Sequence, residues 1–398
     1  MLCVLMNKNT EVMVAEYDEG LKAFTNITEI KNVNYVPYIL KKYYDKNSIN
    51  DNKFRIMLSD WFKGRGIPYL RDKLDLLLHR LNIATPEELL DKAFGMSLSD
   101  QYWIRPYDSN IKYDDINFFD HDFEYAEFQE ASLSLNSQVI AKENSLKTPN
   151  NTTDGMLKKA WVIEDKTRYL LKSGYKNDVL QPFNEVLASM ICERLGFDHV
   201  LYTLEIYNNM LVSKCPCFVT KDTELITANQ IINGEISNDC KKNYDEYVKI
   251  LESNGINKAR EKLENMYILD YIIMNEDRHL NNFGIIRDVN TLKWLDVAPI
   301  FDNGQSLNII DYNDNHSEIV VSGYGRLFFE ILPFDEIIKI VKNIKRIDIA
   351  KLDGIVDEFD KLLRKYRNIT NMSDKKISSL CTLLSRQINK LDKMIKNG

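Results

Sequence analysis

One short stretch restricts the fold of this chain more than any other: residues 275–282, together with the later turn at 301–304. The first reads Asn-Glu-Asp-Arg-His-Leu-Asn-Asn and the second reads Phe-Asp-Asn-Gly. Phosphoryl transfer requires a carboxylate that accepts a hydroxyl proton, and amide and carboxylate oxygens that hold Mg²⁺. The spacing predicts Asp277 as the catalytic base and Asn282 and Asp302 as Mg²⁺ ligands. The fold must therefore bring these two loops together.

The elements expected around these residues support the same chemistry. A helical pattern over 263–273 runs directly into the first loop, and two strand-like runs at 283–286 and 293–297 follow it. Helix, loop, hairpin and metal-binding turn is the order found in the carboxy-terminal lobe of kinases. The alternative is that the Asp and Asn side chains only cap loops around a hairpin, which explains less of the set. We therefore predict an ATP-dependent kinase with ATP and Mg²⁺ as its cofactors.

A candidate nucleotide lysine lies upstream. Residues 160–163 and 168–171 predict a hairpin, and Lys172 ends its second strand. Glu185 lies in a predicted helix over 182–195, where it would pair with Lys172 and fix it against the α- and β-phosphates. Considered alone, Lys172 is better explained as a solvated lysine at the end of a strand. Glu185 alone is better explained as a carboxylate that the helix dipole favours near a helix amino terminus. Jointly, they fit better as a pair.

A loop of small and polar residues at 145–155 precedes this hairpin. Such a loop can present backbone N–H groups and hydroxyls to phosphates, and the candidate contacts are Thr152, Thr153 and Gly155. A solvated surface loop is an equally good interpretation, because the same residue types dominate ordinary turns.

Several other polar residues are expected to have structural roles. We expect Arg278 and His279 to make structural hydrogen bonds or balance local charge, because a catalytic Asp needs no relay in this chemistry. Asp296 is also expected to be structural. Cys215 and Cys217 lack further ligands at zinc spacing, so they are expected to be buried strand thiols.

The pattern along the chain predicts an α+β protein with a two-lobed, protein-kinase-like fold and an additional amino-terminal region. Residues 1–17 predict a hairpin, and Thr85 followed by Pro86 predicts a helix start. The predicted segments are a mixed or helical accessory region at 1–95, an aromatic and acidic linker at 96–142, a kinase N-lobe at 143–222 and a mainly helical C-lobe at 223–398. The aromatic residues of the linker are expected to pack onto a neighbouring domain rather than to form a binding surface.

The composition of the chain limits the binding partners and the cellular location that we expect. The formal charge of −7 argues against direct nucleic-acid binding, which favours a basic face. The six cysteines show no paired CxxC spacing of the kind found in metal sites and disulfide frameworks. No signal-peptide pattern opens the chain, and no apolar run reaches the roughly 18 residues of a membrane span. We expect a reduced, cytoplasmic protein.

Taken together, these residues resemble the HipA-like serine/threonine kinases, which are the toxin family of bacterial HipA/HipB-type modules and their stand-alone relatives. The resemblance covers roughly residues 145–340 and is most specific at 275–282 and 298–306. It implies a bacterial enzyme that transfers the γ-phosphate of ATP to a protein hydroxyl. It also implies that Lys172 binds nucleotide phosphates, that Asp277 is the catalytic base and that the Mg²⁺ ligands are Asn282 and Asp302. An antitoxin-like regulator would be its partner.

Two further expectations come from the resemblance alone. Backbone groups near Cys217, Phe218 and Val219 would form the hinge that receives adenine. Some members of the family phosphorylate their own phosphate loop and lose activity, and the matching hydroxyls here are Ser145, Thr148, Thr152 and Thr153.

The chain departs from eukaryotic-type protein kinases, and two other functions stay open. Asn-Glu-Asp replaces their His-Arg-Asp, Asn303 replaces the Phe of their metal turn, and no Ala-Pro-Glu follows. A kinase of a lipid or small molecule, or a nucleotide-binding pseudokinase that acts as an interaction module, would use a similar fold. The complete set of Lys172, Glu185, Asp277, Asn282 and Asp302 points to turnover rather than to a pseudokinase.

Overall fold

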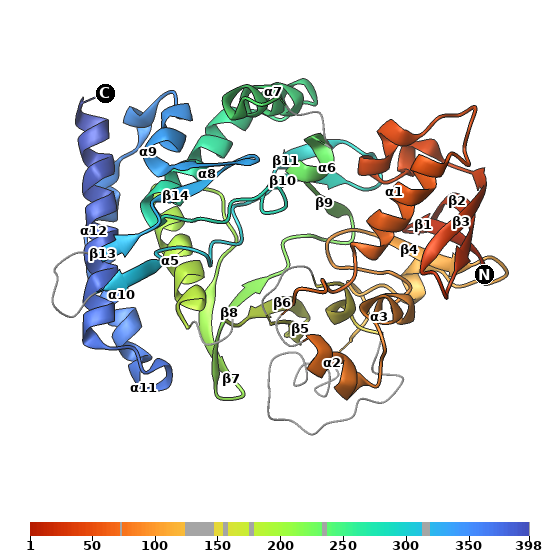
Figure 1. Ribbon diagram of the computed structural model, residues 1–398, viewed down its shortest axis with the longest axis horizontal. Helices are drawn as coiled ribbons and strands as arrows, with labels where there is room; N and C mark the ends of the chain where they lie inside the picture. Colours follow the sequence, from red (N-terminus) through yellow and green to blue (C-terminus); the bar gives the residue numbers. More distant parts are fainter. Residues whose placement is uncertain are drawn as a thin grey trace. The chain divides into compact units, whose positions relative to one another are not determined.

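The computed structural model describes residues 1–71, 74–123, 147–153, 158–174, 179–232, 237–312 and 319–397 (Figure 1). The chain forms two compact units. The first contains Met1–Lys176, Val219–Ile226 and Asp288–Leu292, and the second contains Asn177–Phe218, Thr227–Arg287 and Lys293–Gly398. No helix in the described ranges is long and apolar enough to cross a membrane.

The first unit is built on an antiparallel sheet with strand order β3-β2-β1-β4. Its strands are β1 (Leu2–Asn7), β2 (Thr10–Asp18), β3 (Ala23–Ile30) and β4 (Tyr102–Pro106). The hairpin predicted in residues 1–17 is confirmed by the pairing of β1 with β2. The sheet corrects the predicted division at residue 95, because β4, placed in the linker, pairs with β1 as an edge strand. This pairing joins residues about 100 positions apart, so no local pattern revealed it.

Three helices accompany this sheet: α1 (Asn52–Lys63), α2 (Leu74–Leu81) and α3 (Pro86–Lys92). The predicted helix start is confirmed, since the Thr85 hydroxyl accepts from the Glu88 N–H at 3.3 Å and the Glu88 carboxylate accepts from the Ala84 N–H at 3.1 Å. The first bond satisfies an N–H group that a helix start leaves free, and the second holds the residue before the cap against the first turn. Short 3₁₀ helices complete the region: η1 (Val33–Tyr35), η2 (Tyr38–Tyr43) and η3 (Tyr113–Asp115).

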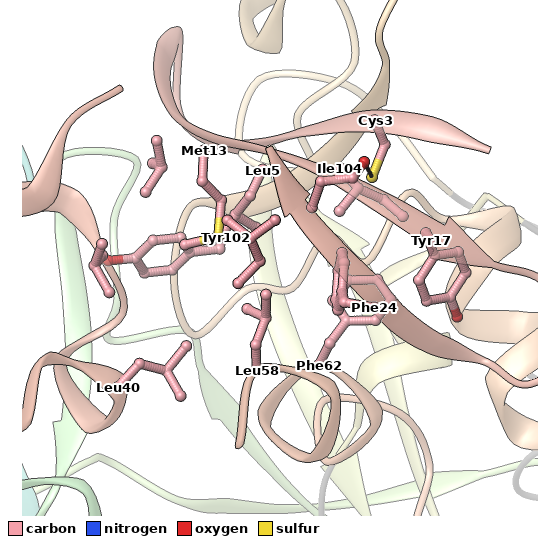
Figure 2. Packing of buried hydrophobic residues seen from close by; sticks show 14 of the residues in the cluster. Cys3, Leu5, Met13, Tyr17, Phe24, Leu40, Leu58, Phe62, Tyr102 and Ile104 are labelled. Carbon is pink, nitrogen blue, oxygen red and sulfur yellow. Dashed lines mark hydrogen bonds between the residues drawn. The ribbon is translucent and has the colours of Figure 1, made fainter. Parts of the chain in front are cut away.

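One face of the sheet packs against α1 to form the main core of the first unit (Figure 2). The rings of Tyr17, Phe24 and Phe62 lie with centroids 5.1–5.7 Å apart at steep angles, an arrangement that aromatic quadrupoles favour. Trp61 of α1 contacts Tyr102 of β4 edge-on at 5.3 Å. The amino-terminal region is therefore mixed, with a β-sheet core of its own.

Several aromatic residues of the predicted linker are core residues of the first unit. Trp103, Phe118 and Phe123 are buried, and the Trp103 indole N–H donates to the Lys8 carbonyl at 2.8 Å. These three side chains pack within the first unit, whereas Tyr107 of the same segment is 46% exposed.

A second hairpin in this unit joins β5 (Lys159–Glu164) to β6 (Thr167–Lys172), as predicted. Asp165 and Lys166 form its two-residue turn with φ of 47° and 64°. Both values lie in the left-handed region that matches the twist of paired strands in such turns.

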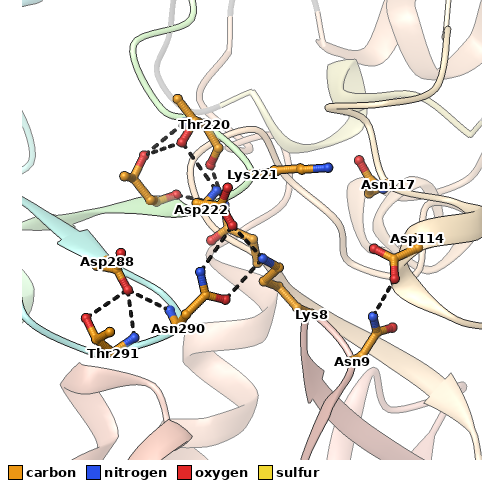
Figure 3. Close-up of polar contacts among 12 residues, drawn as sticks. Lys8, Asn9, Asp114, Asn117, Thr220, Lys221, Asp222, Asp288, Asn290 and Thr291 are labelled. Carbon is orange, nitrogen blue, oxygen red and sulfur yellow. Dashed lines mark hydrogen bonds and ion pairs between the residues drawn. The ribbon is translucent and has the colours of Figure 1, made fainter.

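Two segments from the later part of the chain also belong to the first unit. Asp222 accepts from the Lys8 ammonium at 2.8 Å and from the Asn290 amide at 3.1 Å (Figure 3). The Gln101 amide donates to the Thr220 and Thr223 carbonyls at 2.8 and 2.7 Å. These bonds hold residues 219–226, which include most of β9 (Thr223–Thr227), and residues 288–292 against the β1–β2 turn.

The second unit is mainly helical, and its strands form short hairpins. The helices are α5 (Leu180–Leu195), α6 (Ala228–Ile232), α7 (Cys240–Ser253), α8 (Ala259–Ile273), α9 (Phe334–Ile337), α10 (Ile355–Lys365), α11 (Arg367–Thr370) and α12 (Asp374–Asn397), with short 3₁₀ turns η6 (Ile338–Ile340), η7 (Ile344–Arg346) and η8 (Ile349–Leu352). The hairpins are β7 (Thr203–Tyr207) with β8 (Met210–Pro216), β10 (Gly284–Asp288) with β11 (Trp294–Val297), β12 (Ile309–Tyr312) with β13 (Ile319–Val321), and β14 (Tyr324–Leu327) with β15 (Glu330–Pro333).

The helices that carry the predicted site are buried on nearly all sides. Residues 266–273 of α8 are all buried, and α5 is buried continuously from Leu180 to Ser189. A helix buried all round lies inside its domain rather than on its surface. Gly196, in the left-handed conformation at φ 73°, ends α5 where the sequence predicts.

The core of the first unit gives a stability prediction. Leu58 and Ile56 lie on α1, but Leu58 is fully buried whereas Ile56 is 59% exposed. Replacing Leu58 by Ala should lower the free energy of unfolding by about 2–5 kcal/mol, because it leaves a cavity. The matched Ile56→Ala change should stay within about 0.5 kcal/mol. Urea unfolding followed by tryptophan fluorescence measures both, and equal losses would show that Leu58 is not a core residue.

Candidate active site

A single buried arginine joins both predicted loops. Arg278 is fully buried, and its Nε and Nη2 donate to the two carboxylate oxygens of Asp270 at 2.9 and 2.8 Å. Its Nη1 donates to the carbonyls of Asn282 at 3.0 Å and Phe301 at 2.7 Å. Its Nη2 also reaches the Asn303 side-chain oxygen at 2.6 Å. The expectation of a structural role for Arg278 is confirmed.

The first loop is fixed where α8 ends. Met274 adopts φ 50° and turns the chain out of the helix. The Asn275 amide donates to the Asp270 carboxylate at 3.0 Å, and its oxygen accepts from the Asp277 N–H at 3.3 Å. The Asn282 Nδ2 donates to the Asp277 carbonyl at 2.9 Å. Because this bond uses the side-chain nitrogen of Asn282, the side-chain oxygen can act as an acceptor or a metal ligand.

The second loop starts from a short backbone bridge. Ile300 pairs in parallel with His199, its N–H donates to the Asp198 carbonyl at 3.0 Å, and its carbonyl accepts from the Val200 N–H at 2.9 Å. Asp302 follows with φ 57°, a left-handed conformation that Asp tolerates better than most residues. Its N–H lies 3.4 Å from the Tyr202 hydroxyl.

Helix α5 holds the same turn through two buried polar residues. The Glu185 carboxylate accepts from the Asn303 N–H at 2.8 Å. The Asn184 amide donates to the carbonyls of Gly304 at 2.9 Å and Ser306 at 2.6 Å. Sequence reasoning found Glu185 but missed Asn184. The available signal was an Asn directly before Glu185 in the predicted helix.

The electrostatic environment of Asp277 differs from that of an ordinary surface carboxylate. Burial raises the pKa of Asp277 above its usual range, and the nearby Asp302 carboxylate raises it further. His279 and Arg326 act in the opposite direction, with His279 Nε2 at 3.8 Å and Arg326 Nε at 3.4 Å from the Asp277 carboxylate. Sequence reasoning missed Arg326, which lies on β14, far along the chain from the loop.

The residues present suit Mg²⁺. Asp302 offers a carboxylate and Asn282 an amide oxygen, and Mg²⁺ prefers hard oxygen ligands. Mg²⁺ also keeps several waters and uses only one or two protein carboxylates beside substrate phosphates, so a small protein ligand set is sufficient. Among the described residues, no group of three or more His, Cys, Asp and Glu side chains gathers as a transition-metal site would require.

The predicted nucleotide lysine lies in the other unit. Lys172 ends β6 in the first unit and is buried, whereas Glu185 belongs to the second unit. The pairing of Lys172 with Glu185 therefore stays a prediction.

The described part of the predicted phosphate loop is packed within the first unit. It contains the 3₁₀ helix η5 (Pro149–Thr152). The Thr152 hydroxyl donates to the Met96 carbonyl, and the Thr153 hydroxyl donates to the Asn150 carbonyl, both at 3.0 Å. Ser145 and Gly155 lie outside the described residues. The nucleotide contacts of Thr152, Thr153 and Gly155 remain predictions, and the two threonine hydroxyls already have partners.

The predicted hinge follows β8. The rings of Phe218 and Phe301 lie with centroids 5.3 Å apart, which places an aromatic side chain beside the turn that carries Asp302. Val219 begins the segment that belongs to the first unit. Cys215 is a buried strand thiol as expected, but Cys217 lies beyond the end of β8 and is partly exposed, so that expectation was wrong for Cys217.

Asp296 has the structural role expected of it. Its carboxylate binds the Lys262 ammonium, which extends from α8 to β11. The His279 ring nitrogen Nδ1 accepts from the Asn281 N–H at 3.2 Å, a local bond that shapes the loop.

Comparison with known proteins gives three findings. No family model matches the chain. The serine/threonine-protein kinase CtkA of Helicobacter pylori strain J99 is 30% identical over 196 residues, which is 47% of this chain and 60% of that protein's length. Among solved structures, the CtkA crystal structure matches at 21% identity with a TM-score of 0.43, over 60% of this chain and 90% of that one.

A second solved structure matches over the full length. It is the Shewanella oneidensis complex of HipA, HipB and operator DNA, one chain of which matches at 12% identity and a TM-score of 0.51, over 100% of this chain and 99% of that one. The resemblance to the HipA-like serine/threonine kinases is confirmed by these relatives. The mixed α/β fold is confirmed as well, whereas the two-lobed arrangement stays a prediction.

The buried ion pair gives a testable consequence. Replacing Arg278 by Met should lower the free energy of unfolding by about 3–5 kcal/mol, because Asp270 would remain buried without its counter-charge. Adding Asp270→Leu to that variant should recover a large part of the loss, because both charged partners are then gone. Denaturant unfolding measures each step.

An exposed pair serves as the control for this comparison. The Lys249 ammonium lies 3.5 Å from the Glu246 carboxylate on α7, and both side chains are exposed. Replacing Lys249 by Met should cost at most about 1 kcal/mol. A comparable loss for the Lys249 and Arg278 variants would contradict the assignment of Arg278 as the residue that holds the two loops.

Proposed function

We propose that this chain is an ATP- and Mg²⁺-dependent serine/threonine protein kinase of the HipA-like type. The observation that carries the proposal is the set of bonds from buried Arg278 to both loops. These bonds fix the loop of Asp277 and Asn282 against the turn of Asp302. Phosphoryl transfer depends on this kind of positioning more than on covalent chemistry by the protein.

Asp277 would act on the acceptor. Its carboxylate takes the proton of a serine or threonine hydroxyl as that oxygen forms a bond to the γ-phosphorus of ATP. The bond from the γ-phosphorus to the β–γ bridging oxygen breaks, and ADP leaves. The raised pKa of Asp277, which comes mainly from burial, makes this carboxylate a stronger base than an ordinary one.

Asn282 and Asp302 would hold the metal through oxygen atoms. When bound, Mg²⁺ supplies positive charge that neutralises the phosphate oxygens. The protein's own contribution is to hold these oxygens still. The Asn282 nitrogen is bonded to the Asp277 carbonyl, and the turn that carries Asp302 is bonded to Arg278 and Glu185.

The nucleotide contacts of the proposal come from the resemblance. Lys172 would bind the α- and β-phosphates, with Glu185 orienting it, and backbone groups of Cys217, Phe218 and Val219 would receive adenine. The phosphate loop with Thr152, Thr153 and Gly155 would cover the phosphates through its backbone N–H groups, because both threonine hydroxyls have other partners.

A protein regulator is the proposed partner. The Shewanella neighbour was solved with HipB and operator DNA. An antitoxin-like protein would bind this chain in the same way, and it would supply any DNA contact, since the chain itself carries a formal charge of −7.

Intact-mass measurement of the purified chain with ATP and Mg²⁺ tests the proposal. The wild-type chain should transfer phosphate to itself or to an added protein acceptor, and the sites of self-modification to examine first lie at 145–153. Asp277→Asn should slow transfer about 10²–10⁴-fold, and Asp302→Ala should abolish Mg²⁺-dependent transfer. Asp296→Ala, which removes a carboxylate with a structural partner, is the matched control. Undiminished transfer by the Asp302 variant would overturn the metal-ligand assignment.

The pH dependence of transfer gives a second test. Protonated Asp277 cannot accept a proton, so the rate should fall as the pH falls through its pKa. Because burial raises that pKa, the acidic limb of the rate profile should lie above the range of an ordinary aspartate. The rate constant measured against pH at saturating ATP and Mg²⁺ checks this, and a limb below the ordinary aspartate range would contradict it.

A further inference from the structure

The β14–β15 hairpin has two distinct faces. In the pairing of β14 with β15, Arg326 lies opposite Ile331 and Tyr324 lies opposite Pro333. Side chains directly opposite each other in an antiparallel pair point to the same side, and successive residues alternate. Tyr324, Arg326, Ile331 and Pro333 therefore share one face.

The other face anchors the hairpin to the helices of the second unit. Leu327 is fully buried, and a Cβ on Gly325 would lie 2.6 Å from the Phe334 ring, so that ring occupies the space of a side chain. The Phe328 ring packs against Tyr244 and Tyr247 of α7 with centroids 6.3 and 5.8 Å apart. This anchoring gives the opposite face a fixed position.

The face with Arg326, which we call the outer face, exposes apolar side chains. Tyr324 is 50% exposed and Ile331 is 62% exposed, and Phe329 in the turn is about half exposed. Single exposed apolar residues are common on protein surfaces, but contiguous ones mark interaction sites.

The outer face reaches the catalytic loop through Arg326. Its Nε lies 3.4 Å from the Asp277 carboxylate, and both side chains are partly exposed. Among the described residues, this carboxylate and no other lies within ion-pair distance of the Arg326 guanidinium. Arg guanidinium groups bind carboxylates through two parallel N–H bonds, so the remaining nitrogens are suited to a second carboxylate.

We propose that the outer face of the β14–β15 hairpin, formed by Tyr324, Arg326, Ile331 and Pro333, is the docking surface for a polypeptide acceptor. The segment it fits carries an apolar side chain, which packs on Tyr324 and Ile331, and an Asp or Glu, which binds Arg326. An acceptor hydroxyl must reach Asp277, and Arg326 contacts that carboxylate, so the acceptor chain passes over this face. The inference rests on the proposed function and deepens it by naming the chemistry of the acceptor.

A degenerate peptide library with a fixed central Ser or Thr tests the proposal. The purified full chain, ATP and Mg²⁺ should phosphorylate best the peptides with an apolar residue and an Asp or Glu at fixed distances from the hydroxyl. Tyr324→Ser and Ile331→Ser should each raise the KM for a selected peptide about tenfold, as expected for losing one buried apolar contact, and should leave kcat nearly unchanged. Ile206→Ser, a change at an exposed position of β7, is the matched control.

A charge reversal supplies a readout that a merely structural residue would not give. Arg326→Glu should change the preferred peptides from acidic to basic at the corresponding position. Arg386→Glu on α12 makes the same change at an exposed site and should leave the preference unaltered. Preference is compared within each variant, so a lower overall rate for the Arg326 variant does not obscure the result. A thermal shift with ATP confirms that each variant is folded.

The outcomes separate the two claims. If the wild-type chain transfers phosphate to no protein or peptide, the proposed function fails and the inference fails with it. If the wild-type chain phosphorylates peptides but the Tyr324, Ile331 and Arg326 variants retain its KM and preference, the hairpin inference alone is overturned. Transfer only to small molecules would also overturn it.

Discussion

The ion pair between Arg278 and Asp270 is the interaction on which the rest of the candidate site depends. Both side chains are buried, and removing two charges from water is costly unless their hydrogen-bonding groups find partners. Here they do. Asp270 also accepts from Asn275, and the remaining Arg278 donors go to backbone carbonyls of both loops and to Asn303. The buried Arg278 donors therefore hold both loops in one position, because any shift of either loop would leave a buried donor without an acceptor.

Helix α5 completes this frame from a second direction. Asp302 has a backbone conformation that non-glycine residues seldom adopt, and such conformations persist only where the surroundings determine them. Glu185 and Asn184 supply that constraint by binding the backbone of the turn at Asn303 and Gly304. Glu185 thus has a role within the second unit that does not require Lys172. The turn that carries Asp302 is held by α5 and by Arg278, which come from separate parts of the sequence.

Sequence patterns predicted the parts of this structure that depend on neighbours along the chain. The hairpin ending at Lys172, the capped start at Thr85, the end of α5 at Gly196 and the order of elements around Asp277 all follow from local periodicity and turn chemistry. Local reasoning also suggested the structural role of Arg278.

The parts that the sequence could not predict are set by contacts between distant segments. Strand β4 belongs to the amino-terminal sheet because it pairs with β1. Arg326 has nothing in its surrounding sequence to connect it with Asp277, yet it lies 3.4 Å from that carboxylate. The buried bonds around Arg278 and Glu185 therefore differ from the β14–β15 hairpin in the groups that make the contacts. The bonds around Arg278 and Glu185 join buried charged side chains mainly to backbone atoms, whereas the hairpin presents exposed side chains, of which Arg326 contacts Asp277.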